Sequence, residues 1–345
     1  MSTTKAPGSR LREFAEFLAA VFYFFLARAM AHQASLVLAA GSFPALGSPL
    51  AEQCILAVLL LMGYAAMGFW LEREMHPFST QGFPRRAGFL HEAGVGLATG
   101  WALAVVCIVP VVVLGGIALS FSTGLSSWEW LAADAAFFAL VTLVEEVAFR
   151  GFAFQSLMRA IGPIGATLGF AVYYALVETM LTGSSGASMA VSIALALVLS
   201  VAYLRTRALW LSWGLNFGWK ASRALVFGLA VSGDNSHSSV VQGDPMGPFW
   251  VTGGGYGLDA TWVAFVVLLA ALPVIFKVTR DLDFRYNAPD LVPGGIPVDL
   301  DGAARAQHEA AMGTAEPAAP ALVQIAAAPQ PAAEGGSERE RGNGS

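Results

Sequence analysis

The sequence LVTLVEEVAFRGFAFQ, residues 140–155, is the most informative segment of this chain. It places two adjacent glutamates, Glu145 and Glu146, and an arginine, Arg150, inside one of the most apolar parts of the chain. A charged side chain at the centre of a bilayer costs roughly 2.5–3.5 kcal/mol even on lenient insertion scales. An ionisable cluster in such a place therefore predicts a functional site in which the charges have partners.

The whole chain of 345 residues is unusually apolar, with 56% hydrophobic and 12% charged residues. Soluble domains carry about 25% charged residues. The apolar runs continue to about Ile275, and many approach the ~20 residues that cross a bilayer as a helix. They are continuous, unlike the alternating segments of outer-membrane strands. We therefore predict an all-α, multi-pass transmembrane helical bundle.

We expect about eight spans in this bundle. They are residues 16–31, 54–71, 95–120, 131–149, 164–181, 187–204, 208–231 and 261–276. The apolar segment 35–46 is broken by Gly41, Pro44 and Gly47 and is expected to be re-entrant or interfacial. Three regions follow: N-terminal membrane helices with a cytoplasmic loop (1–88), a membrane core (89–276) and a cytoplasmic, largely disordered Ala/Pro/Glu-rich tail (277–345).

Basic residues alternate between successive connections. Lys and Arg gather before the first span and after the second, fourth, sixth and eighth. The intervening loops 121–130, 182–187 and 232–259 contain neither residue. Because Lys and Arg are enriched in cytoplasmic loops, we expect a cell (cytoplasmic or inner) membrane protein with both termini in the cytoplasm.

Charge and cysteine usage exclude several classes of partner. The net charge is −5, and the absence of a basic stripe argues against nucleic acid as a partner. Cys54 and Cys107 both lie in apolar runs, where we expect buried small hydrophobic residues rather than a disulfide or a zinc site. We expect no metal and no cofactor. The expected partners are membrane lipids and a hydrophobic or lipidated peptide.

The spacing within the quoted segment separates the roles of its carboxylates. Glu146 and Arg150 are four residues apart and share a helix face, so the arginine can hold Glu146 ionised. Glu145 points about 100° away toward another neighbour. A free, partly desolvated glutamate is suited to act as a general base on water.

This segment resembles the first motif, EExxxR followed by Gly-Phe, of the CAAX protease and bacteriocin-processing family, also called CPBP or Abi. The resemblance extends from about Phe89 to Pro273. Ile161-Gly162-Pro163 and the stretch from Tyr203 to Lys220 fall in register with further family sequence. It implies a CAAX-protease-like membrane core and an intramembrane endopeptidase that uses glutamate-activated water.

The second and third motifs depart from the family pattern. FxxxH falls on Tyr174 to Glu178, so glutamate replaces the histidine. HxxxN falls on Asn216 to Lys220, so asparagine replaces the histidine and lysine replaces the asparagine. None of the five histidines, His32, His76, His91, His237 and His308, lies in the last five predicted spans.

Two functions remain open on the sequence. In one, Glu178 shares a proton with Glu145 as in aspartic-type peptidases, Asn216 donates a hydrogen bond to an oxyanion, and Lys220 neutralises Glu178. In the other, the protein is a catalytically inactive relative that binds a membrane peptide, lipid or partner protein. A transporter-like use of the charges is disfavoured, because the chain shows no inverted repeat.

Small residues are expected to allow close helix packing: Gly165, Gly169, Gly214 and Gly218.

Overall fold

The computed structural model describes residues 7–40, 49–73, 75, 76, 78, 81–84, 86–121, 127–183, 186–282 and 308. The chain divides into two units, Met1–Ala288 and Pro289–Ser345, and every helix named below belongs to the first. The predicted tail lies mostly outside the described residues. Within the predicted interfacial segment 35–46, residues 35–40 continue the first helix, and the remainder also lies outside the described residues.

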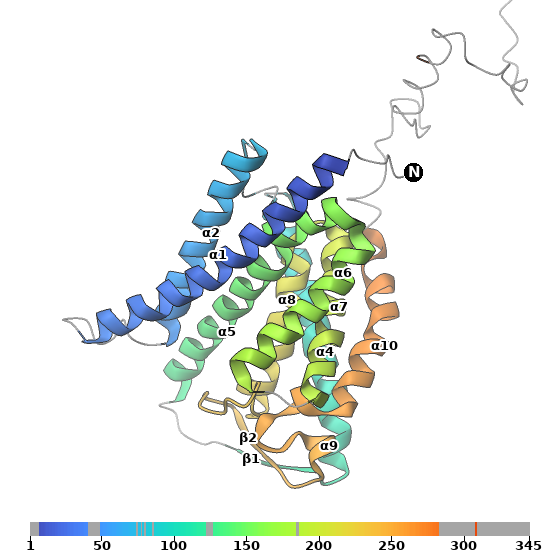
Figure 1. Cartoon of the computed structure of the whole chain (residues 1–345). Helices are drawn as coiled ribbons and strands as arrows, with labels where there is room; N and C mark the ends of the chain where they lie inside the picture. The colour runs from blue at the N-terminus through green and yellow to red at the C-terminus, as the bar shows by residue number, and fades with distance from the viewer. Residues whose placement is uncertain are drawn as a thin grey trace, which may run out of the picture. The chain divides into compact units, whose positions relative to one another are not determined.

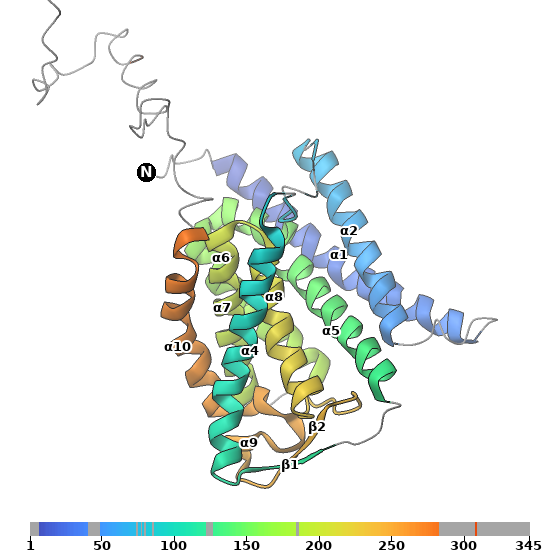
Figure 2. The ribbon, with the colours of Figure 1, turned by 180° about the vertical axis from the view of Figure 1, so that it is seen from behind.

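Long helices build the first unit (Figures 1 and 2). They are α1 (Pro7–Ala40), α2 (Pro49–Glu72), α4 (Phe89–Val113), α5 (Ser127–Arg150), α6 (Phe152–Thr182), α7 (Gly186–Thr206), α8 (Leu209–Ala221) and α10 (Trp262–Val278). A helix stands at the position of every predicted span. By length and composition α1, α2, α4 and α7 can cross a membrane, and α10 is a shorter apolar helix. The fold is a multi-pass helical membrane bundle.

The predicted third span, 95–120, is wrong beyond the end of α4. The chain turns at Gly115, whose φ of 77° suits a residue without a Cβ. It then enters strand β1 (Ile117–Phe121), which pairs antiparallel with β2 (Val241–Pro245). A small two-stranded sheet therefore closes one end of the otherwise helical unit, beside the short helix α9 (Phe249–Thr252) (Figure 1).

The predicted seventh span, 208–231, is also wrong in its second half. Helix α8 passes into a π-helical turn, η2 (Ser222–Val226), and the helical backbone ends before Gly228, whose φ is 59°. Two 3-10 turns, η3 (Gly254–Tyr256) and η4 (Leu258–Ala260), follow before α10. The π turn widens the helix at the residue where Arg223 bonds to Asp259 of η4.

Helix α6 is interrupted where its sequence requires it. Gly162 has φ 85° and ψ 166°, which is not a helical conformation, and Pro163 follows it. Proline has no N–H to donate and disfavours helical backbone in the preceding residue. The interruption explains why the apolar run of the predicted fifth span begins at residue 164.

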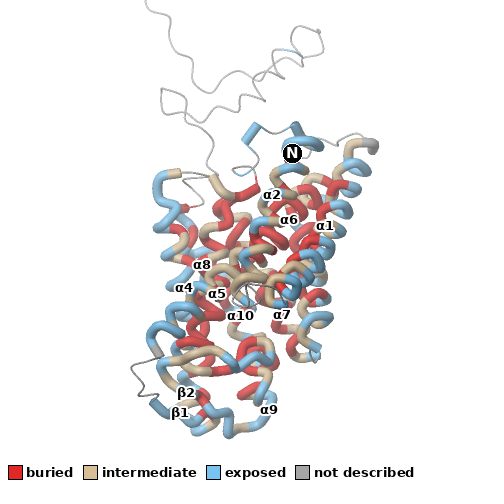
Figure 3. Tube along the Cα trace, turned by 90° about the vertical axis from the view of Figure 1, so that its left-hand side faces the viewer, coloured by how far each residue is buried: buried red, intermediate tan, exposed pale blue. Residues whose placement is uncertain are grey.

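Buried residues run through the interior of the helical unit (Figure 3), and two large groups of buried apolar residues hold the helices together. One joins α1, α2, α5 and α6 and includes Phe24, Leu60, Phe149 and Phe170. The other joins α4, α7, α8 and α10 and includes Ile108, Leu199, Leu215 and Leu268. Helices α5 and α8 contact each other across these groups, and the charged residues of the predicted site lie on these two helices and on α6.

Glycines bring α4 and α8 into backbone contact: Gly96, Gly100, Gly214 and Gly218. A Cβ at any of these positions would overlap a backbone carbonyl oxygen of the facing helix. The close approach predicted at Gly214 and Gly218 is therefore confirmed. The same prediction is wrong for Gly165 and Gly169, because the nearest atoms to each belong to side chains of α6 itself.

Candidate active site

Helix α5 presents its two glutamates to different neighbours. Glu146 is fully buried and accepts a hydrogen bond from Arg150 Nη1 at 3.3 Å. Arg150 also donates to the Ala196 carbonyl of α7 at 3.3 Å and lies 5.5 Å from the centre of the Tyr174 ring of α6. The ion pair that the four-residue spacing predicts is present, and it ties α5 to α6 and α7.

Asn216 of α8 connects the two glutamates. Its amide nitrogen donates to Glu145 Oε2 at 2.9 Å and to Glu146 Oε1 at 3.1 Å. The amide has two N–H groups, and both are directed to carboxylates. In this arrangement Asn216 fixes the positions of the two carboxylates relative to each other. The donation from Asn216 to an oxyanion stays a prediction.

Lys220, one turn after Asn216 on α8, pairs with Glu145. The distance from Lys220 Nζ to Glu145 Oε1 is 2.5 Å, and the side chains are 7% and 17% exposed. The sequence did not predict this contact with Glu145. Lys220 also shares a cavity with Glu178 and acts on it electrostatically, so the neutralisation of Glu178 by Lys220 stays a prediction. The four-residue spacing places Lys220 and Asn216 on one face of α8, and that face meets α5.

Glu178 of α6 is bonded to the chain that follows η2. Ser232 Oγ donates to Glu178 Oε1 at 2.6 Å, and Ser232 N–H donates to Asp259 Oδ2 at 3.1 Å. Asp259 in turn accepts from Arg223 Nη1 at 2.6 Å. The sequence did not predict that Ser232, Asp259 and Arg223 belong to the site. Arg223 could have been found from the sequence, because it is an ionisable residue inside an apolar run, as Glu145 is. Ser232 and Asp259 lie in a polar loop, where polar residues are ordinary and do not indicate a site.

A cavity of about 310 Å³ opens beside these charges. Glu145, Glu178 and Lys220 line it, whereas Glu146 and Arg150 are buried and do not. The side chains that complete its wall come from several helices and include Phe24, Arg28, Gln53, Val144 and Val177. Of the six predicted site residues, three can therefore meet a bound molecule and three support them from behind.

His237 lines the same cavity. It lies in the loop 232–259, outside the predicted spans, so its place beside Glu145 and Glu178 was not expected from the sequence. Among the described residues, no group of three or more His, Cys, Asp or Glu is arranged to hold a metal ion.

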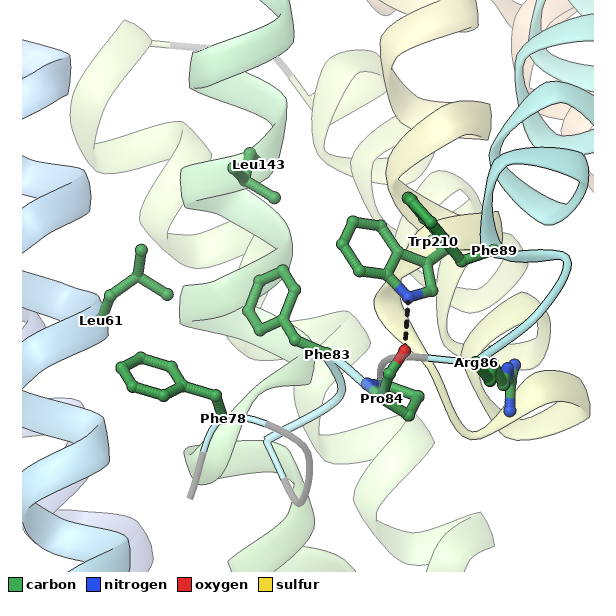
Figure 4. A pocket seen from close by; sticks show the side chains of 8 residues that line it. All are labelled: Leu61, Phe78, Phe83, Pro84, Arg86, Phe89, Leu143 and Trp210. Carbon is green, nitrogen blue, oxygen red and sulfur yellow. Dashed lines mark hydrogen bonds between the residues drawn. The ribbon is translucent and has the colours of Figure 1, made fainter. Parts of the chain in front are cut away.

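A larger cavity of about 580 Å³ lies between α2, α5 and α8 (Figure 4). Its wall is mostly apolar, with Leu61, Leu143 and Trp210 facing one another across it and Trp210 Nε1 donating to the Pro84 carbonyl at 3.3 Å. None of the six predicted site residues lines this cavity. The predicted site residues therefore gather at the smaller, charged cavity and not at this apolar one.

Comparison with known proteins identifies the segment that holds the site. Residues 127–222 match the family model described as type II CAAX prenyl endopeptidase Rce1-like. The chain carries a CPBP-family domain. The matched segment runs from α5 through α8 and includes all six predicted site residues. No curated protein and no solved structure matches the chain.

Within the CPBP-family domain, the residues at the altered motif positions gather around the first motif. Asn216 and Lys220 both contact Glu145, and Glu178 shares its cavity. The expected resemblance from 89 to 273 is wider than the matched segment, and its flanking parts stay a prediction.

Proposed function

We propose that this CPBP-family protein is an intramembrane endopeptidase that hydrolyses a membrane-associated peptide in the 310 Å³ cavity. The observation that carries the proposal is the convergence of Glu145, Glu178 and Lys220 on that one cavity. Two carboxylates that share one proton activate water in aspartic peptidases. The family match supports the same class of reaction.

In the network of bonded side chains around the cavity, acidic groups outnumber cationic groups by one. Its acids are Glu145, Glu146, Glu178 and Asp259, and its cations are Arg150, Lys220 and Arg223. Such a network becomes neutral when it binds one proton, and neutrality is favoured where water is excluded. This composition supports a site in which the one carboxylate without a cation in direct contact, among the described residues of the network, accepts a proton from water.

Glu178 is the stronger candidate for the general base. Lys220 bonds to one carboxylate oxygen of Glu145 and Asn216 to the other, so both oxygens of Glu145 are already engaged. The bond that Glu178 makes to the described residues is with the Ser232 hydroxyl. In this proposal Glu178 takes a proton from the attacking water, and Lys220 stabilises the oxyanion that forms at the peptide carbonyl. Arg150 and Glu146 position Glu145 through Asn216.

The cavity supports a hydrophobic or lipidated peptide as the substrate. Its volume of about 310 Å³ lies at the lower end of the ~300–1,000 Å³ found for ligand sites, which suits a few side chains rather than a folded domain. Phe24, Val144 and Val177 give it apolar walls. Membrane lipids around the bundle are the expected surroundings from which such a peptide enters.

The direct Lys220–Glu145 contact favours a second candidate function. In this alternative the ion pair neutralises the motif glutamate, and the protein binds a membrane peptide, a lipid or a partner protein without cleaving it. Glu178 and Asn216 stand where the family motifs have histidines, which agrees with a loss of the original chemistry.

Peptide cleavage by the purified protein in liposomes tests both candidates. Wild type is compared with Glu145→Gln and Glu178→Gln on a library of prenylated and hydrophobic peptides. Glu129→Gln, an exposed site on α5, is the matched control. We expect cleavage by wild type and the control and its loss in both other variants. Cleavage only after combining Glu178→His, Asn216→His and Lys220→Asn would instead support the inactive binder.

We also propose that the protein lies in the cytoplasmic membrane with both termini in the cytoplasm. The alternation of basic residues along the chain supports this orientation. Single cysteines at Arg207 and Ser236, in a chain lacking Cys54 and Cys107, are expected to react with an impermeant thiol reagent from opposite sides of the membrane. Labelling of both cysteines from the same side of the membrane would exclude this orientation.

A further inference from the structure

The loop that carries His237 is folded back onto the start of α5. Val231 and Asp234 form an isolated bridge, and Val240 N–H donates to the Leu225 carbonyl of η2 at 2.8 Å. The Ser238 N–H donates to Asp134 Oδ2 of α5 at 2.7 Å. These backbone contacts on both sides of His237 determine where its ring lies.

Aromatic and acidic side chains hold the imidazole of His237. The ring centroids of Phe137 and Phe138 lie 5.5 and 4.6 Å from that of His237. Nδ1 is 3.7 Å from Asp134 Oδ1, and Nε2 is 3.3 Å from Asp234 Oδ2. The His237 side chain is only 11% exposed. A carboxylate beside an imidazole orients the ring.

The electrostatic state of Asp234 supports this arrangement. Partial burial alone would raise the pKa of Asp234, but hydrogen bonds from Ser236 and the nearby His237 together hold it below its ordinary value. Asp234 therefore remains a carboxylate next to the ring at neutral pH.

His237 and the catalytic glutamates share one cavity and one face of α5. Phe138, Val141 and Glu145 all line the cavity, and their spacing places them along one face of the helix. Phe138, which contacts His237, and Glu145 are seven residues apart, or about 10 Å along the axis. The imidazole therefore borders the same space as the two glutamates of the cavity.

We propose that His237 is the catalytic acid of this site. This role rests on the proposed endopeptidase function. The oxygen of water attacks the peptide carbonyl carbon and forms the new C–O bond, while the water gives one proton to Glu178. His237 gives its proton to the leaving nitrogen as the C–N bond breaks. The proton on Glu178 then returns to His237, and the products are a new carboxyl group and a free amine.

A comparison of two substrates with different leaving groups tests this step. One substrate is a peptide amide that wild type cleaves in the assay above, and the other is a p-nitrophenyl ester of the same acyl segment. Nitrophenolate departs without a proton, whereas an amine cannot. His237→Gln is expected to lower kcat for the amide by about 100-fold or more with little change in KM, and to hydrolyse the ester at a near-normal rate. His91→Gln, exposed at the start of α4, should match wild type on both.

The pH dependence of amide cleavage is a second readout. An acid catalyst must carry its proton, so wild type should lose activity on the alkaline side, and His237→Gln should lack that decline. The charged groups that face the imidazole ring of His237 or share its cavity are Arg28, Asp134, Glu145, Glu178, Lys220 and Asp234. The His91→Gln control retains all of them. His237→Ala with added imidazole should recover part of its amide cleavage, which guards against a defect in folding.

The outcomes separate the two proposals. A wild type that leaves the amide intact overturns both the role of His237 and the endopeptidase function. Amide cleavage that is lost in Glu178→Gln but kept in His237→Gln overturns only the role of His237. Equal losses on amide and ester, without rescue by imidazole, also overturn it.

Discussion

Lys220 Nζ lies 2.5 Å from Glu145 Oε1, so an ammonium from α8 directly pairs with the first glutamate of α5. Asn216, one turn earlier on α8, bonds to the same carboxylate and to Glu146. The altered third motif therefore forms a contact with the retained first motif rather than leaving it without partners. This contact explains how a lysine is tolerated within a membrane helix.

Removing the lysine should destabilise the protein strongly. Lys220→Met leaves Glu145 without its cation in a site that is only 17% exposed, and we expect a loss of about 3–5 kcal/mol in the free energy of unfolding. Unfolding in mixed micelles measures it. Lys220→Met combined with Glu145→Gln should recover much of the loss, and Lys277→Met, at an exposed position, should change little. A large effect in the control would contradict the assignment.

The α4–α8 contact depends on its glycines. Gly100→Ala or Gly214→Ala places a Cβ against a facing carbonyl oxygen, and overpacking of this kind costs about 1–3 kcal/mol. Gly94→Ala is the control, because a Cβ there meets nothing within 4 Å. It should be neutral or slightly stabilising in a helix. Equal thermal midpoints for all three variants would show that the helices do not pack in this way.

The hydroxyl of Ser232 should matter for catalysis because it donates to Glu178 at 2.6 Å. Hydrogen bonds to charged groups contribute about 1.5–3 kcal/mol, so Ser232→Ala is expected to lower kcat about tenfold or more in the cleavage assay. Ser120→Ala, on the exposed part of β1, should cleave normally. An unchanged kcat in Ser232→Ala would remove Glu178 from the role of base.

Asp234 should give the protein a pH-dependent component of stability. Burial opposes the shift, but Ser236 and His237 lower the pKa of Asp234 below its ordinary value of 3.8. A carboxyl group with a lower pKa in the folded protein stabilises it above the unfolded pKa, and this contribution disappears as the pH falls through the folded pKa. Asp234→Asn should therefore melt below wild type at neutral pH.

The difference in melting temperature between wild type and Asp234→Asn should shrink as the pH falls below about 3.8. Thermal unfolding in detergent across a pH series measures it, with the exposed Asp244→Asn as the control. A difference that persists unchanged in acid would mean that the substitution disturbs packing rather than charge.

The sequence alone determined the elements that depend on local chemistry. Apolar runs predict helices at the right places because a backbone in hydrocarbon must satisfy its own hydrogen bonds. The Glu146–Arg150 pair follows from a four-residue spacing on one helix. The limits of local reasoning appear at Gly115 and Gly228, where runs that remain apolar leave the helix for a strand and a loop.

Only the tertiary structure decided which charges meet. Lys220 and Glu145 are 75 residues apart, and their contact depends on the rotation of α8 against α5, which the glycine contacts between α4 and α8 help to fix. His237 reaches the cavity because backbone hydrogen bonds fold its loop onto α5. No local pattern specifies such contacts, because they arise from the packing of elements that are distant in the sequence.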